Sequence, residues 1–421
     1  MRKMKKIVAL VTGILVLGVT PLTLVGCGSG GGAEEPVQFF IADDQGGAVA
    51  AMVERYNKET EGNVELVEIP YSDFDTRISN MIQAGEFPGI VRHPGVDYTW
   101  RDHLLDLTDV ANSNGVRYDL SVRDENDDIR ALAFDLTVVG MFINTTLFEA
   151  AGVDWPETEE DIWRWDEFLD ALDTVIDNSD ARYGLVIDGS DHRLRAFVYQ
   201  HGGMGFFTED GGETYTTDAA TIAAMERFVE LNDDRMIPRS VWLTGESAAS
   251  MFGSGQVAAH MSGSWQVQDY SETIGDFEWR PIYMPYQEVR GTNLGGNFIA
   301  AFEGSGQEEG ALAFLNWLYT PENYADLMVL GGYLPVIEDL EIPYDEAIKE
   351  MFDVFVKEME AAGPISSEQM ISGTTRALYG QRGLTGVWRD AMVRLLNDEI
   401  TMETLLEEVT EDYRQADEVS E

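Results

Sequence analysis

Strand-like and helix-like segments alternate along the first part of this chain, and that alternation limits the fold more than any other feature. Three short apolar runs have the length of strands, and two segments between them repeat apolar residues at the spacing of one helix face. In order, these segments are residues 37–41, 49–56, 64–69, 74–82 and 87–91. Strands and helices that alternate across short loops predict an α/β fold with a parallel sheet and crossover helices.

Ligands of such sheets bind beyond the carboxyl ends of the strands. Polar residues that follow the three predicted strands are therefore candidates for a binding cleft. They are Asp43, Asp44, Tyr71 and His93.

Further helices are predicted in the second half of the chain. Residues 311–318 carry a helical apolar stripe, and Thr320-Pro321 has the form of a helix start with proline at the first position. This second helix should end at Gly331-Gly332. The acidic tail, residues 388–414, is predicted to be helical.

The N-terminus has the pattern of a secretory signal peptide over residues 1–26, with a cationic start and an apolar run over 7–19. The run ends at Leu24-Val25-Gly26-Cys27, which resembles the lipobox of bacterial lipoproteins and implies lipidation of Cys27. An ordinary signal peptide with an incidental cysteine is the alternative. Because Cys27 is the sole cysteine, the chain forms no internal disulfide. Residues 27–36 should then be a lipidated, glycine-rich tether.

The chain is strongly acidic, with a formal net charge of −48. Loss of residues 1–26, which hold four basic and no acidic residues, would bring it to about −52. Such a charge excludes nucleic acid as a partner and opposes adhesion to anionic lipid. It indicates either a solvated surface suited to saline surroundings or a cationic ligand, and the even spread of the acids favours the first.

Several stretches resemble, in the right order, the extracellular solute-binding proteins of bacterial sugar transporters, the family that includes maltose-binding proteins. They are residues 81–91, 131–144, 147–168, 252–265, 294–319 and 332–335. The chain departs from the family pattern at Gly89, at the missing proline before Phe134 and at Gln256.

The resemblance implies a monomeric binding protein of the periplasmic type II fold, with two α/β lobes around a hinged cleft. Its expected first lobe is residues 37–138 plus 295–335, and its second is 139–294 plus 336–421. Ligand would close the lobes, and the permease of an ABC importer would recognise the closed form. The protein would be extracytoplasmic, lipid-anchored to the cell membrane, without cofactor and without enzymatic activity.

A sugar site needs an aromatic plate for the C–H face, and carboxylate or amide groups for the hydroxyls. Trp265 aligns with the family's stacking tryptophan, and Trp242 is a second candidate. Asp135 falls at the predicted crossover, and Gly296 with Asn297 begins the return strand, where a larger side chain at 296 should intrude on the cleft. Weaker candidates for the rim are Arg376 and Arg382.

Three other functions stay open as alternatives. The same fold could bind a polyamine, a metal ion or a compatible solute, and a surface glycoside hydrolase would use two of the many carboxylates. Asp124, Asn126 and Asp128 have the spacing of half an EF-hand, with Asp135 at its twelfth position, but the required glycine and glutamate are missing. The five histidines show no zinc-ligand spacing, so no metal site is predicted.

Overall fold

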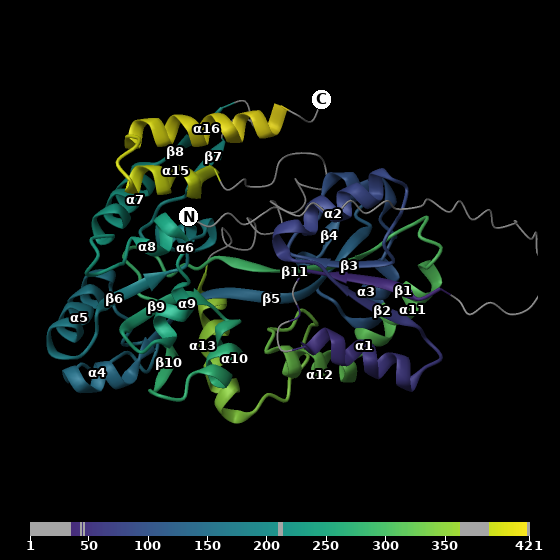
Figure 1. Cartoon of the computed structure of the whole chain (residues 1–421), viewed down its shortest axis with the longest axis horizontal. Helices are drawn as coiled ribbons and strands as arrows, with labels where there is room; N and C mark the ends of the chain where they lie inside the picture. Colours follow the sequence, from purple (N-terminus) through teal and green to yellow (C-terminus); the bar gives the residue numbers. More distant parts are fainter. Residues whose placement is uncertain (1–34, 43, 45–46, 209–213, 363–386, 419–421) are drawn as a thin grey trace, which may run out of the picture. The chain divides into compact units, whose positions relative to one another are not determined.

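The computed structural model describes residues 35–42, 44, 47–208, 214–362 and 387–418 (Figure 1). Residues 36–421 form one compact unit, to which all of the following refers. Its main sheet has nine strands, seven of which follow the order β2-β1-β3-β11-β5-β9-β6, while β4 and β10 pair with β5. No helix of the described residues has the length and apolar character needed to cross a membrane.

The alternating segments at the start of the chain form the parallel end of the sheet, as predicted. Strand β1 (Val37–Ile41) pairs in parallel with β2 (Val64–Glu68) on one side and with β3 (Ile90–His93) on the other. Helices α1 (Ala48–Glu59) and α2 (Tyr71–Gln83) connect them. The predicted apolar stripe of α1 is buried, because it faces the sheet.

Strand β5 (Ile129–Asn144) runs through the centre of the sheet and changes partners along its length (Figure 1). Up to Val138 it pairs with β11 (Leu294–Ala301), and from Val139 it pairs with β9 (Val257–Gly263). Its last residues also pair with β10 (Trp279–Ile282). The expected passages between the two lobes, at residues 138–139 and 294–295, fall on β5 and β11. The lobe boundaries themselves stay a prediction.

The other elements complete the fold. The shorter strands are β4 (Val122–Arg123), β6 (Tyr183–Ile187), β7 (Phe206–Thr208) and β8 (Tyr215–Thr217). The helices up to the end of β9 are η2 (Tyr98–His103), α3 (Thr108–Asn114), η3 (Tyr118–Leu120), α4 (Thr145–Ala151), α5 (Trp165–Asn178), α6 (Asp191–Gln200), α7 (Ala219–Leu231), α8 (Ser240–Thr244) and α9 (Ala248–Gly253). Those that follow are α10 (Gln266–Thr273), α11 (Glu308–Leu318), α12 (Pro321–Gly331), α13 (Glu346–Ala361), α15 (Val387–Leu396) and α16 (Met402–Glu418).

The structure confirms the predicted start and end of α12, and it adds a break within the helical acidic tail. Helix α12 begins at Pro321 and ends against Gly332, whose φ of 60° is the left-handed conformation that glycine adopts without strain. The acidic tail was predicted to be helical, and it forms two separate helices, α15 and α16. The chain turns between them at Asp398, which has a φ of 57°, and the two helices pack together through the Arg394–Glu408 ion pair. The connecting residues include Asn397 and Asp398, which are poor helix formers, and Thr401 caps α16 by accepting the N–H of Thr404 at 3.2 Å.

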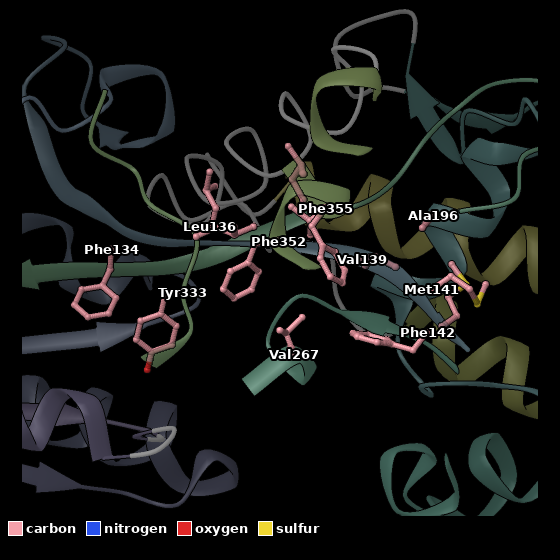
Figure 2. Packing of buried hydrophobic residues seen from close by; sticks show 14 of the residues in the cluster. Phe134, Leu136, Val139, Met141, Phe142, Ala196, Val267, Tyr333, Phe352 and Phe355 are labelled. Carbon is pink, nitrogen blue, oxygen red and sulfur yellow. The ribbon is translucent and has the colours of Figure 1, made fainter. Parts of the chain in front are cut away.

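Helix α13 packs on β5 just beyond the point where the strand changes partners. The Phe355 ring of α13 lies 5.6 Å from that of Phe142, and both belong to the main hydrophobic cluster (Figure 2). A Cβ atom built on Gly140 would stand 2.2 Å from a ring carbon of Phe355. Glycine is therefore required at 140 by the close approach of the helix to the crossing strand.

We predict that Gly140→Ala lowers the free energy of unfolding by about 1–3 kcal/mol, because a methyl group there forces the buried Phe355 ring aside. Gly253→Ala is the matched control, since a Cβ at 253 meets no atom within 4 Å. The control should not lower stability and should raise it by up to about 1 kcal/mol, because alanine at a compatible helical position restricts the unfolded chain. Urea unfolding of both variants measures the difference, and equal stabilities would contradict this account of Gly140.

Candidate ligand-binding site

A cavity of about 190 Å³ lies where β5 changes partners. The carboxyl ends of β1 and β3 contribute to it, together with β5, β11, the turn after β9 and the residues that follow α12. Its lining residues are Ala42, Arg92, Pro94, Asp135, Leu136, Thr137, Ser264, Trp265, Asn297, Gly332 and Tyr333. Residues far apart in the sequence thus meet at the edge of the sheet where the α/β fold places ligands.

Asp135 on β5 organises the base of the cavity. Its carboxylate accepts a hydrogen bond of 2.8 Å from Nη2 of Arg92 on β3. It also accepts bonds from the backbone N–H of Asn297 on β11 at 3.0 Å, and from the Asn297 amide nitrogen at 2.8 and 3.0 Å. These contacts occupy about as many acceptor positions as a carboxylate has. Asp135 therefore holds Arg92 and Asn297 in place more than it offers oxygens to a ligand.

The Arg92 guanidinium lies among aromatic rings. Its central carbon is 4.6 Å from the centroid of the Phe134 ring and 5.4 Å from that of Tyr333. Figure 2 shows these two rings near each other, with centroids 6.1 Å apart. The buried charge is thus compensated twice, by the Asp135 carboxylate and by the ring faces.

The strands β5 and β11 approach unusually closely beside Asp135. A Cβ atom on Gly296 would stand 2.2 Å from the Asp135 carbonyl oxygen. The pairing shifts register between Asn297 and Phe298, so that Phe134 is the extra residue of a β-bulge. Glycine is required at 296, as predicted, but the reason was wrong: a side chain there would strike the backbone of β5.

Trp265 forms the wall of the cavity that comes from the turn after β9. The residue is partly buried, and its ring lies so close to Gly263 that a Cβ there would stand 1.9 Å from a ring carbon. The turn is tied to the crossing strand at Val138, whose carbonyl accepts the N–H of Ser264 at 2.9 Å. The predicted aromatic plate thus lies in the cavity, on a turn fixed to β5.

Besides Gly296, which does not line the cavity, three predicted site residues lie elsewhere or in another role. The Asp44 carboxylate accepts the N–H groups of Val49 and Ala50, both at 2.8 Å, and so caps α1. The His93 ring stacks on Phe74 with a centroid distance of 4.9 Å and does not line the cavity. Trp242 is only 1% exposed and donates its indole N–H to the Ile187 carbonyl, which makes it a core residue in this structure.

The remaining candidates cannot be placed. Asp43, Arg376 and Arg382, as well as Cys27, lie outside the described residues, and so does the side chain of Tyr71.

Eight lining residues of the cavity were missed by sequence reasoning, and four of them carry polar side chains: Arg92, Thr137, Ser264 and Tyr333. Neighbouring side chains of a strand point to opposite faces of the sheet. His93 was predicted as the site residue of this strand, but its neighbour Arg92 faces the cavity. The sequence held a signal that Arg92 belongs to a site, because this arginine follows the two apolar residues that begin β3. An arginine in a buried strand needs a partner, which is a reason to suspect a site.

The cavity is close to electrically neutral. Asp135 is the sole carboxylate among its described lining residues, and Arg92 compensates it. The described part of the chain holds no group of three or more histidine, cysteine or acidic side chains placed to bind a metal. The EF-hand-like stretch is engaged otherwise, since Asp124 accepts a bond of 2.7 Å from Arg130.

The central strand β5 changes its pairing partners along its length, and a cavity lies at that point. These two features are those of a ligand-binding protein of the periplasmic type II α/β fold. The chain belongs to the family of bacterial extracellular solute-binding proteins, whose model matches residues 51–350.

A curated relative is the lactose-binding protein of Rhizobium radiobacter, 26% identical over 289 residues. The alignment covers 64% of this chain and 66% of that protein. Among solved structures, an ABC substrate-binding protein of Listeria monocytogenes in complex with cycloalternan has a TM-score of 0.73 at 18% identity, covering 91% of this chain and 99% of that one. The acarbose-binding receptor of Streptomyces glaucescens has a TM-score of 0.72 at 19% identity, covering 90% and 98%. These structural likenesses show the fold.

We predict that Asp135→Leu destabilises the protein by about 3–5 kcal/mol, because it leaves the Arg92 charge buried without its partner. The double variant Arg92→Met with Asp135→Leu should recover a large part of that loss, since no uncompensated charge is left. Urea unfolding of both single variants and the double variant measures the coupling. Losses that simply add would show that the two side chains are not energetically linked.

Proposed function

We propose that this protein captures a neutral carbohydrate outside the cytoplasm and delivers it to the permease of an ABC importer. The observation that carries the proposal is the composition of the cavity: an aromatic plate, Trp265, faces a neutral polar base built from Arg92, Asp135 and Asn297. A sugar presents an apolar C–H face and hydroxyl edges, and these two surfaces match the plate and the base.

A cationic ligand fits this cavity poorly. Polyamines and metal ions need carboxylates that are free to compensate them, whereas Asp135 is bonded to Arg92 and Asn297. The large negative charge of the chain therefore belongs to its surface and not to the described lining of the site. This favours the saline-surface explanation of the charge over a cationic ligand.

The relatives support a carbohydrate. One is named for lactose, and two of the structural neighbours hold or bind cycloalternan and acarbose. Family membership supports an extracellular location. The lipid anchor at Cys27, the monomeric state and the division into two closing lobes belong to this proposal.

A glycoside hydrolase is disfavoured by the same geometry. Hydrolysis needs two carboxyl groups on either side of the scissile bond. The described lining holds one, and its oxygens are already engaged by Arg92 and Asn297. We therefore propose binding without catalysis.

The test is isothermal titration of the chain from Gly28 onward with lactose, maltotriose and cycloalternan, and with spermidine as the cationic competitor. We expect one sugar to bind with a dissociation constant of about micromolar, roughly −8 kcal/mol. Affinity should change less than about threefold between roughly 0.15 and 1 M salt, because a neutral ligand is not screened. Product analysis should find the sugar unchanged.

Trp265→Ala should weaken sugar binding by about 30-fold or more, equivalent to about 2 kcal/mol, as expected for a central aromatic contact. Trp317→Ala is a matched control, because Arg55 lies over the Trp317 ring as Arg193 lies over that of Trp265, but Trp317 does not line the cavity. Binding of spermidine that weakens steeply with salt, with none of the sugars bound, would overturn the carbohydrate assignment and leave the fold intact.

A further inference from the structure

A second arginine–aspartate pair, which is partly buried, lies beside the cavity. Arg193, in the first turn of α6, donates from Nε and Nη2 to one oxygen of Asp188 at 3.1 and 2.8 Å. Asp188 directly follows β6, and the Arg193 side chain is only 12% exposed. The charge pair therefore lies at the carboxyl end of β6, within the part of the sheet that β9 joins to the crossing strand.

Asp188 is fixed by two further side chains, one of which is held in turn by Tyr270. His260 on β9 contacts the other carboxylate oxygen of Asp188 at 2.9 Å, and Ser262 donates at 2.6 Å to the oxygen that Arg193 bonds. The second ring nitrogen of His260 meets the Tyr270 hydroxyl at 2.5 Å. Burial alone would raise the pKa of Asp188, but His260, Arg193 and Ser262 outweigh it and hold the pKa well below its usual range. These contacts favour the charged form of Asp188.

The Arg193 guanidinium stands over the Trp265 ring, with its central carbon 4.5 Å from the ring centroid. Trp265 lines the cavity, whereas Arg193 does not, so the arginine supports the ring from outside the cavity. The Trp265 ring also lies against residue 263, where glycine leaves the space that the ring needs. The indole therefore has one face covered by a cation that is itself held by Asp188 and, at 3.2 Å, by Ser190.

We infer that Arg193 is a positioning residue of the ligand site: clamped by Asp188, it fixes the orientation of Trp265 and leaves a single indole face for the ligand. Lysine cannot replace it fully, because an ammonium lacks the planar fork that stacks on the ring and bonds Asp188 twice. The Ser262–Asp188–His260 cluster thereby has a structural role, which is to hold Arg193 in place, and this role needs no catalysis. His260 is fully buried, and both its ring nitrogens are engaged.

The inference rests on the proposed function in one respect, that Trp265 is the plate on which the ligand stacks. The first experiment therefore needs no ligand. The protein is labelled with 5-fluorotryptophan, the Trp265 signal is assigned with Trp265→Phe, and its fluorine shift is compared in H₂O and D₂O. In Arg193→Met and in Asp188→Asn we expect this signal to broaden or move and its solvent isotope shift to increase, because the ring has lost its support.

Arg193→Lys should give an intermediate signal, and thermal melting confirms that each variant is folded. Arg227→Met is the control, since Arg227 pairs with Asp166 on another part of the protein and does not contact Trp265. It should leave the Trp265 signal unchanged. A Trp265 signal in folded Arg193→Met or Arg193→Lys that is identical to that of the parent would overturn the inference, whatever the protein binds.

The second experiment titrates the same variants with lactose, maltotriose and cycloalternan. We expect Arg193→Met to weaken binding at least tenfold and Arg193→Lys to weaken it less, while Arg227→Met binds normally. Unchanged affinity in folded Arg193→Met would contradict the positioning role. If the parent protein binds none of these sugars, the proposed function fails, and the fluorine signal by itself still decides whether Arg193 positions Trp265.

Discussion

The Asp135 carboxylate joins three strands near the point where β5 changes its pairing partner. Arg92 comes from β3, Asn297 from β11, and Asp135 itself from β5. Burying such a pair costs desolvation energy that the attraction of the two charges only partly offsets. Its contribution is therefore geometric, because it fixes which polar groups face the cavity and how closely β5 and β11 approach each other.

Two arginine–aspartate pairs, one buried and one partly buried, flank the cavity. Arg92 with Asp135 forms its base, and Arg193 with Asp188 stands behind the Trp265 plate. Each pair is neutral as a unit, so a strongly acidic protein has a site without strong charge. The surface charge can then suit the medium, while the site recognises a ligand by shape, stacking and hydrogen bonds.

Much of the fold could be predicted from local patterns. The three parallel strands, their two helices, and the start and end of α12 follow from periodicity, proline and glycine, which act over a few residues. The break between α15 and α16 was not predicted, although Asn397, Asp398 and the capping Thr401 are local signals for it. Within the site, Trp265, Asp135 and Asn297 were found, whereas Arg92 and Tyr333 were not.

The sequence by itself determined the order of strands and helices, the family resemblance and the position of glycine at 296. Only the tertiary structure decided that Arg92 rather than its neighbour His93 faces the cavity, and that Trp265 rather than Trp242 lines it. The physical reason is that a strand offers two faces and a tryptophan suits a core as well as a surface. Which face meets the cavity is fixed by contacts such as that of Asp135 with Asn297, which lies 162 residues further along the chain.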